Sequence, residues 1–135
     1  MVNGIEIFEY NGAGYKPLVY SQGWMVALLN YEDIMGLDRA IEIERHVKTD
    51  EVFILLKGQA AFYLVAEGQP LQVLELKPGL VYNVIKGTWH NLLATQDAAF
   101  AIIENRDTDK FDTEIRQLTD QEHQSMLGQL PGWLK

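Results

Sequence analysis

The groups in this chain that can do chemistry are imidazoles, carboxylates and phenols. The sequence contains 3 histidines and 19 acidic residues, and it contains no cysteine. The absence of cysteine excludes disulfides, thiolate nucleophiles and zinc sites built on cysteine. Glu44 and His46 lie two residues apart in a stretch that alternates with period two, so both side chains are expected on one face of a strand.

Short strands separated by turn residues must position these groups. Strands are predicted at residues 5–10, 24–31, 39–46, 51–57, 59–66, 71–76, 80–85, 89–95 and 98–105. Many short apolar strands at this spacing favour a closed barrel or a sandwich. The segment 106–114 is rich in charge and is expected to be a solvated loop. A helix is predicted at residues 119–128, where Thr119 and Glu122 have the spacing of a capping box.

Two segments, in order, resemble the two halves of the cupin signature. The first half reads Glu44-Arg45-His46, then Glu51, then Gly58, and the second half reads Gly79, then Gly87-Thr88-Trp89-His90. Three positions depart from the usual pattern: Glu44 replaces a first histidine, Ile85 stands where proline is common, and Ala94 stands where an asparagine often follows. The resemblance implies an all-β fold, the double-stranded β-helix or jelly-roll barrel, followed by the short C-terminal helix. It also implies one domain over residues 1–135, with its core at about 38–106.

The resemblance further implies that His46, Glu51 and His90 converge inside the barrel. Two imidazoles and one carboxylate suit a divalent metal, namely iron, manganese, nickel or zinc. Glu44 shares the face of His46, so it is either a fourth ligand or a catalytic base, and Tyr82 is a candidate general acid. The alternative is a metal-free polar pocket, in which an arginine or a bound proton compensates the carboxylates.

Three functions are compatible with such a pocket. The first is a metal-dependent lyase or isomerase acting on a small, oxygen-rich metabolite. The second is a metal-free lyase, because Gly87-Thr88-Trp89-His90 and the run from Ile102 to Asp107 also look like ureidoglycolate lyase, a looser likeness. The third is a small-molecule binding module without catalysis.

The net charge and the outward-facing residues of the strands indicate which binding partners to expect. The net charge is −8, and the basic residues are scattered, so neither nucleic acid nor an anionic membrane is an expected partner. The N-terminus does not resemble a signal peptide, so a cytoplasmic location is expected. If Glu44 and Glu51 face inward, an apolar outer area remains, and a homodimer is predicted to cover it. The residues of this apolar area are Ile41, Ile43, Val52, Ile54 and Leu56.

Overall fold

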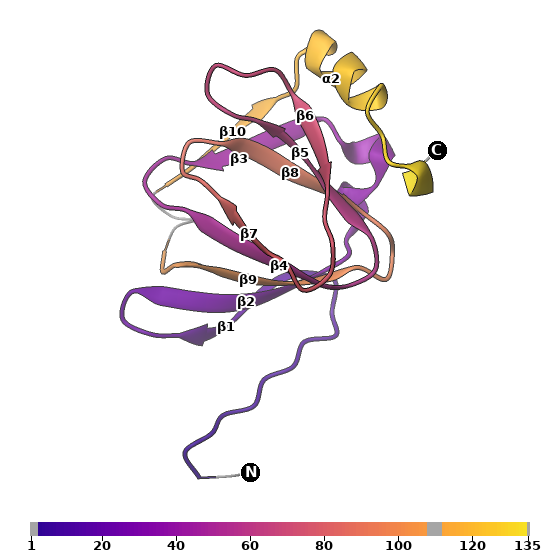
Figure 1. Cartoon of the computed structure of the whole chain (residues 1–135). Helices are drawn as coiled ribbons and strands as arrows, with labels where there is room; N and C mark the ends of the chain where they lie inside the picture. The colour runs from indigo at the N-terminus through magenta and orange to yellow at the C-terminus, as the bar shows by residue number, and fades with distance from the viewer. Residues whose placement is uncertain (1–2, 108–111, 135) are drawn as a thin grey trace.

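Two antiparallel sheets face each other and enclose the core of the molecule (Figure 1). This is a computed structural model, and it describes residues 3–107 and 112–134. The first sheet has the order β1-β2-β9-β4-β7, and the second has the order β10-β3-β8-β5-β6. The architecture is the jelly-roll barrel that the sequence predicts.

The strands are short, as their turn residues require. Those of the first sheet are β1 (Gly14–Tyr20), β2 (Trp24–Asn30), β9 (Ala99–Asn105), β4 (Glu51–Lys57) and β7 (Val81–Val84). Those of the second sheet are β10 (Thr113–Gln117), β3 (Glu42–His46), β8 (Trp89–Ala94), β5 (Ala60–Val65) and β6 (Gln72–Glu75). Three short 3-10 turns, η1 (Asp33–Met35), η2 (Leu37–Arg39) and η3 (Gly132–Leu134), accompany them.

The main core lies between the two sheets. Alternate residues of each strand point inward, so Phe53, Phe100 and Ile102 of the first sheet pack against Phe62 and Leu92 of the second. Phe53 and Phe62 meet edge to face, with their ring centroids 5.1 Å apart. This apolar core supports the polar groups that line the same interior.

A second core lies outside the second sheet, under helix α2 (Asp120–Leu127). Ile43 of β3 and Leu93 of β8 are fully buried there with Met126 of the helix. Figure 1 shows this helix beside the second sheet, on the side of the molecule away from the N-terminal segment. The helix begins with the predicted capping box, since the Thr119 hydroxyl accepts from the Glu122 amide and the Glu122 carboxylate accepts from the Thr119 amide.

The structure corrects the sequence prediction at the N-terminal end. Residues 5–10 form no strand, and they run as an extended segment away from the barrel (Figure 1). The first strand is β1 instead. Its Pro17 argues against a central strand, but β1 is an edge strand with a bulge between Pro17 and Val19, where a missing amide is tolerated.

The charged segment 106–114 was predicted to be a loop, and part of that prediction is wrong. Residues 108–111 lie outside the described residues. Asp112 is buried, and its carboxylate accepts from the Lys48 amide and the Thr49 hydroxyl. Strand β10 starts at Thr113 and pairs with β3.

Within the described part of the chain, no helix is long and apolar enough to cross a membrane.

Candidate functional site

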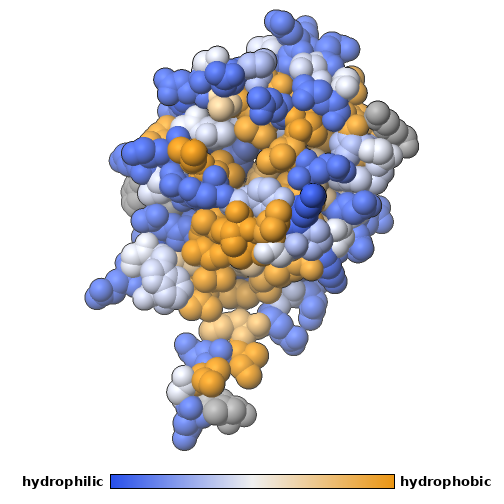
Figure 2. All heavy atoms as spheres, viewed as in Figure 1, coloured by the Kyte–Doolittle hydropathy of each residue, from blue (hydrophilic) through white to orange (hydrophobic). Residues whose placement is uncertain are grey.

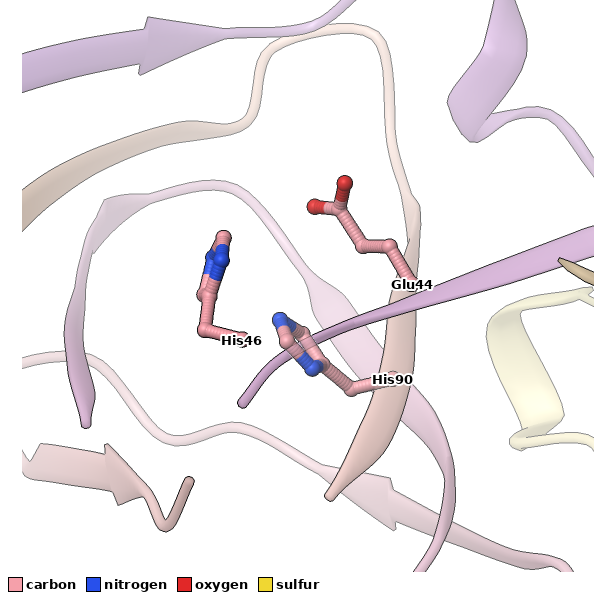
Figure 3. Close-up of side chains that lie close together, drawn as sticks. All are labelled: Glu44, His46 and His90. Carbon is pink, nitrogen blue, oxygen red and sulfur yellow. The ribbon is translucent and has the colours of Figure 1, made fainter. Parts of the chain in front are cut away.

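Strand β3 carries a polar stripe into the barrel. Glu42, Glu44 and His46 point inward in turn, and the first is exposed, the second half-buried and the third buried. In the register of the second sheet, Glu44 lies directly opposite His90 of β8. Figure 3 shows Glu44, His46 and His90 reaching into the same space. The inward register assumed from the sequence is therefore the observed one.

Glu51 reaches this space from the first sheet. Its Oε1 lies 3.0 Å from Nε2 of His46 and 3.2 Å from Nε2 of His90. All three side chains are buried. The residues that the sequence placed at one point thus meet at one carboxylate oxygen, at separations typical of neighbouring ligands around one small cation.

A close backbone contact brings the two signature segments together. The Gly87 amide donates to the His46 carbonyl, 2.7 Å away, and Gly87 has a positive φ of 84°. A side chain at this position would be strained in that conformation. The glycine of the second half therefore sets the position of His90 relative to His46.

The hydrogen bonds of the imidazoles constrain where their protons lie. Nδ1 of His90 is 2.9 Å from the Thr88 carbonyl, which only accepts, so this nitrogen carries a proton. Nε2 of His90 then either carries a second proton toward Glu51 or presents a lone pair to it. The second case requires either a proton on Glu51 or a cation between them. Nδ1 of His46 is paired with the Thr113 hydroxyl, which can act in either role.

Burial and mutual charge shift the pKa values of this cluster. Burial raises the pKa of Glu51, but hydrogen bonds from His46 and His90 outweigh it and lower that pKa to about 2. Burial lowers the pKa of His46, yet the hydrogen bond and charge of Glu51 raise it on balance. Burial, the largest cause, raises the pKa of Glu44. The site therefore favours cations near neutral pH.

Glu104 of β9 is the site residue that the sequence analysis missed. It is buried, and its Oε1 accepts from the Tyr15 hydroxyl at 2.5 Å. Burial and the neighbouring Glu51 raise the pKa of Glu104 to about 8. The one signal in the sequence is alternation, because Phe100, Ile102 and Glu104 share one face of an otherwise apolar strand.

The cluster lines a cavity of about 430 Å³. Apolar walls come from residues such as Leu29, Phe53 and Ile102. The carboxylates on its lining are Glu32, Glu42, Glu44, Glu51 and Glu104. Among the described residues, no lysine or arginine lines it. The arginine partner that the metal-free alternative offered is therefore missing from the described lining.

Tyr82, the predicted general acid, lies elsewhere. It points into the barrel from β7 and packs against Phe62, but it does not line the cavity that holds Glu44. Its hydroxyl accepts from the Lys77 amide at 2.8 Å. Tyr82 lines a separate cavity of about 250 Å³, which His90 also borders.

No family model matches the chain, and no curated protein matches it in sequence. Solved structures do match. A cupin-2 domain protein from Shewanella frigidimarina is 25% identical, with a TM-score of 0.54 over 72% of this chain and 85% of that one. A variant of Streptomyces Pac13 with uridine is 17% identical, with a TM-score of 0.57 over 84% of this chain and 88% of that one.

Two further comparisons agree on the architecture. A protein from Bacillus halodurans is 19% identical, with a TM-score of 0.56 over 76% of this chain and 83% of that one. Pac13 itself is described as a nucleoside dehydratase with a β-barrel. The strand order, the paired signature segments and these neighbours together show that this chain has the fold of the cupin superfamily.

Proposed function

We propose that this chain is a metal-dependent lyase or isomerase that acts on a small, oxygen-rich and uncharged molecule in its barrel. The observation that carries the proposal is the meeting of His46 and His90 at one oxygen of Glu51.

The donors present fit a divalent cation. Two imidazole nitrogens and buried carboxylate oxygens, without thiolate, suit iron, manganese, nickel or zinc. Buried carboxylates are costly without compensation, and Glu51 and Glu104 are both buried. Oε2 of Glu104 has no hydrogen-bond partner among the described residues. A cation held by His46, His90 and Glu51, with Glu44 as a candidate fourth ligand, relieves this cost.

The protein side chains supply binding and proton transfer. When bound, the metal would polarise a carbonyl or stabilise a developing oxyanion. Glu44 is half-buried on the lining of the cavity, so it can take a proton from a substrate held there if it is not itself a ligand. The apolar walls exclude water around the reacting group.

The cavity lining argues for an uncharged substrate. Its five carboxylates repel anions, and no described lysine or arginine on the lining would attract them. Hydroxyl groups are suitable donors to such carboxylates. Uridine, the ligand of the Pac13 structures, is an uncharged molecule rich in hydroxyls, and Pac13 is a dehydratase. These features favour a polyol or a nucleoside over a sugar acid or a phosphate.

Isothermal titration with Zn²⁺ or Mn²⁺ tests the proposal. His90→Ala is expected to weaken binding by more than about a hundredfold, since even the loss of an outer-shell partner costs about 10- to 100-fold. His123→Ala is the matched control, because His123 lies in helix α2 and does not line the cavity. Equal affinities of the wild type and His90→Ala would refute the metal site.

A metal-free lyase of the ureidoglycolate lyase kind is the second candidate. The observation that favours it is the pairing of buried Glu104 with Glu51, because burial and this neighbour raise the pKa of Glu104 to about 8 and make it a proton donor near neutral pH without any metal. Turnover that persists in a chelator would support this candidate. The third candidate, a binding module, predicts that ligands raise the melting temperature but that no product forms.

We also propose a homodimer, on a different surface from the one expected. The outer side chains of the first sheet form two rows across three strands, Val26-Ile103-Val52 and Leu28-Ala101-Ile54. Val81 extends this face and is 67% exposed. Figure 2 shows hydrophobic side chains gathered in the region of β4 and β7 and along the N-terminal segment. A two-fold pairing of this sheet would cover them.

A further inference from the structure

We propose that Glu104 is a ligand of the metal, that Tyr15 positions it, and that Glu44 is thereby left to face the substrate. The inference rests on the proposed function, since it concerns the same metal. It adds a residue that lies outside both signature segments, and it decides between the two roles that the sequence left open for Glu44.

The sheet register places Glu104 beside the metal-binding groups. Glu51 of β4 and Glu104 of β9 are direct partners across adjacent antiparallel strands, and both point into the barrel. Like charges directly opposite each other in a sheet are destabilising. Two buried carboxyl groups in this position therefore call for a positive charge between them, either a shared proton or a metal cation.

The two oxygens of Glu104 differ in their surroundings. Oε1 accepts from the Tyr15 hydroxyl. Oε2 has no hydrogen-bond partner in the described part of the chain, although Glu104 is only 7% exposed. Oε2 lies 4.0 Å from Nε2 of His46, and ligand atoms of His46, Glu51 and Glu104 all lie within 4.8 Å of one another. The unpartnered oxygen thus belongs to one cluster with His46 and Glu51, while His46 and His90 form a second such group with Glu44.

Charge balance favours Glu104 over Glu44 as the second carboxylate ligand. Two imidazoles and two carboxylates neutralise one divalent cation, whereas a third carboxylate would leave a net negative charge in a buried site. Glu104 is buried, and Glu44 is only half-buried, on the stripe that leads to the exposed Glu42. A ligand entering along this stripe thus passes Glu42 and meets Glu44 before it reaches the buried donors.

Tyr15 acts through Glu104. Its hydroxyl fixes Oε1, which leaves Oε2 for the metal. Partners of this kind orient ligands, and their loss usually costs 10- to 100-fold in metal affinity. Tyr15 is therefore a positioning residue, and it links edge strand β1 to the site.

Isothermal titration of metal-free protein with Zn²⁺ tests these roles separately. Glu104→Gln is expected to weaken binding by more than about a hundredfold, and Tyr15→Phe by about tenfold. Glu44→Gln should bind Zn²⁺ within about threefold of the wild type, a change of less than 1 kcal/mol. The matched control is Glu67→Gln, an exposed turn residue outside this cavity.

A spectrum of the Co²⁺-substituted protein gives a second readout. Loss of a ligand changes the visible absorption of bound Co²⁺, so Glu104→Gln should alter that spectrum and Glu44→Gln should not. Without metal and at pH 9, where this carboxyl group is ionised, Glu104→Gln is expected to be at least as stable as the wild type, because it removes an uncompensated buried carboxylate. A residue with a merely structural role would instead lose stability.

The outcomes separate this inference from the proposed function. If the wild type binds neither Zn²⁺ nor Co²⁺, the proposed function fails, and this inference fails with it. If the wild type binds but Glu104→Gln keeps its affinity and spectrum, only the inference is overturned. If Glu104→Gln is unstable without metal, Tyr15→Phe decides, and an unchanged affinity in that variant overturns the inference.

Discussion

At the scale of single residues, the chemistry depends on how buried carboxylates are compensated. Glu51 is held ionised by two imidazoles, and Glu104 is pushed toward its protonated form by burial and by Glu51. A metal would replace the protons in this cluster. The pH dependence of stability and of metal binding should therefore have opposite signs.

Stability of the metal-free protein is expected to fall as the pH rises. The pKa of Glu104 is about 8 in the folded protein and 4.5 ordinarily, so the folded state holds a proton that the unfolded state releases between these values. Its contribution is full below about pH 4.5 and is lost toward pH 8. The raised pKa of His46 acts in the same direction. Urea unfolding in a chelator at pH 5, 7 and 9 measures this slope.

The matched variants for that experiment are Glu104→Gln and Glu67→Gln. The first should flatten the slope, and the second should keep it. Stability that rises between pH 5 and pH 9, or a slope that Glu104→Gln leaves unchanged, would contradict the environment assigned to Glu104.

Metal affinity is expected to rise with pH instead. A ligand must lose its proton before it binds, and the raised pKa values of His46 and Glu104 mean that protons compete near neutral pH. Titrations at pH 7 in buffers of different ionisation enthalpy should report the release of about one proton or more. An affinity that is the same at pH 5 and pH 8, with no proton released, would argue against a site built on these residues.

Sequence patterns predicted part of this cluster and missed part of it for a physical reason. His46, Glu51 and His90 follow local spacings within strands, and those spacings fix the direction of each side chain. Glu104 joins the cluster through its pairing with Glu51 across 53 positions of sequence, as the register shows. A long-range pairing of this kind leaves no local pattern beyond one polar residue on an apolar face.

At the scale of elements, the alternation of apolar residues predicts the central strands, and the capping box predicts the helix. Neither signal predicts the edge strands. The structure confirms β4 at the predicted bounds, and the capping box of Thr119 and Glu122 forms as predicted. Strand β1 was missed because Pro17 weakens a strand pattern. Strand β10 was missed because its charged residues do not resemble a strand, although such residues are accepted at the edge of a sheet. Edge strands need less apolar patterning than central ones.

Helix α2 is expected to stabilise the barrel without affecting the site. Met126 is fully buried against Ile43 and Leu93 on the outer side of the second sheet. Met126→Ala should lower the free energy of unfolding by about 2–5 kcal/mol through lost packing. The half-exposed neighbour Leu127 provides the control, since Leu127→Ala should cost much less. Chemical denaturation measures both, and an equal loss in the two variants would contradict the packing described.

At the scale of the whole molecule, the apolar surface predicted from the sequence combines residues that do not lie side by side in the structure. Strands β3 and β4 are consecutive in the chain but belong to different sheets, so their outer residues do not form one patch. Ile43 faces outward as expected, but helix α2 covers it. Val52 and Ile54 lie on the outer face of the first sheet, where β2 and β9 extend the apolar surface.

The proposed dimer through that face is testable with one charged substitution. Light scattering at micromolar concentration should give twice the monomer mass of 15.4 kDa. Val81→Lys should shift the protein toward the monomer, because it places a charge in an apolar interface, and Val81 is exposed enough for the fold to tolerate the change. Ile41→Lys, outside the first sheet, should leave the mass unchanged. A wild type of monomer mass would rule out the dimer.

His46, His90 and Glu51 are proposed to hold one divalent metal. Anomalous diffraction from a crystal of the protein loaded with Zn²⁺, measured on both sides of the zinc edge, locates the metal directly. We expect one strong peak per chain, about 2.0–2.2 Å from Nε2 of His46, Nε2 of His90 and an oxygen of Glu51. A peak only at surface carboxylates, or no peak in the barrel at full loading, would contradict it.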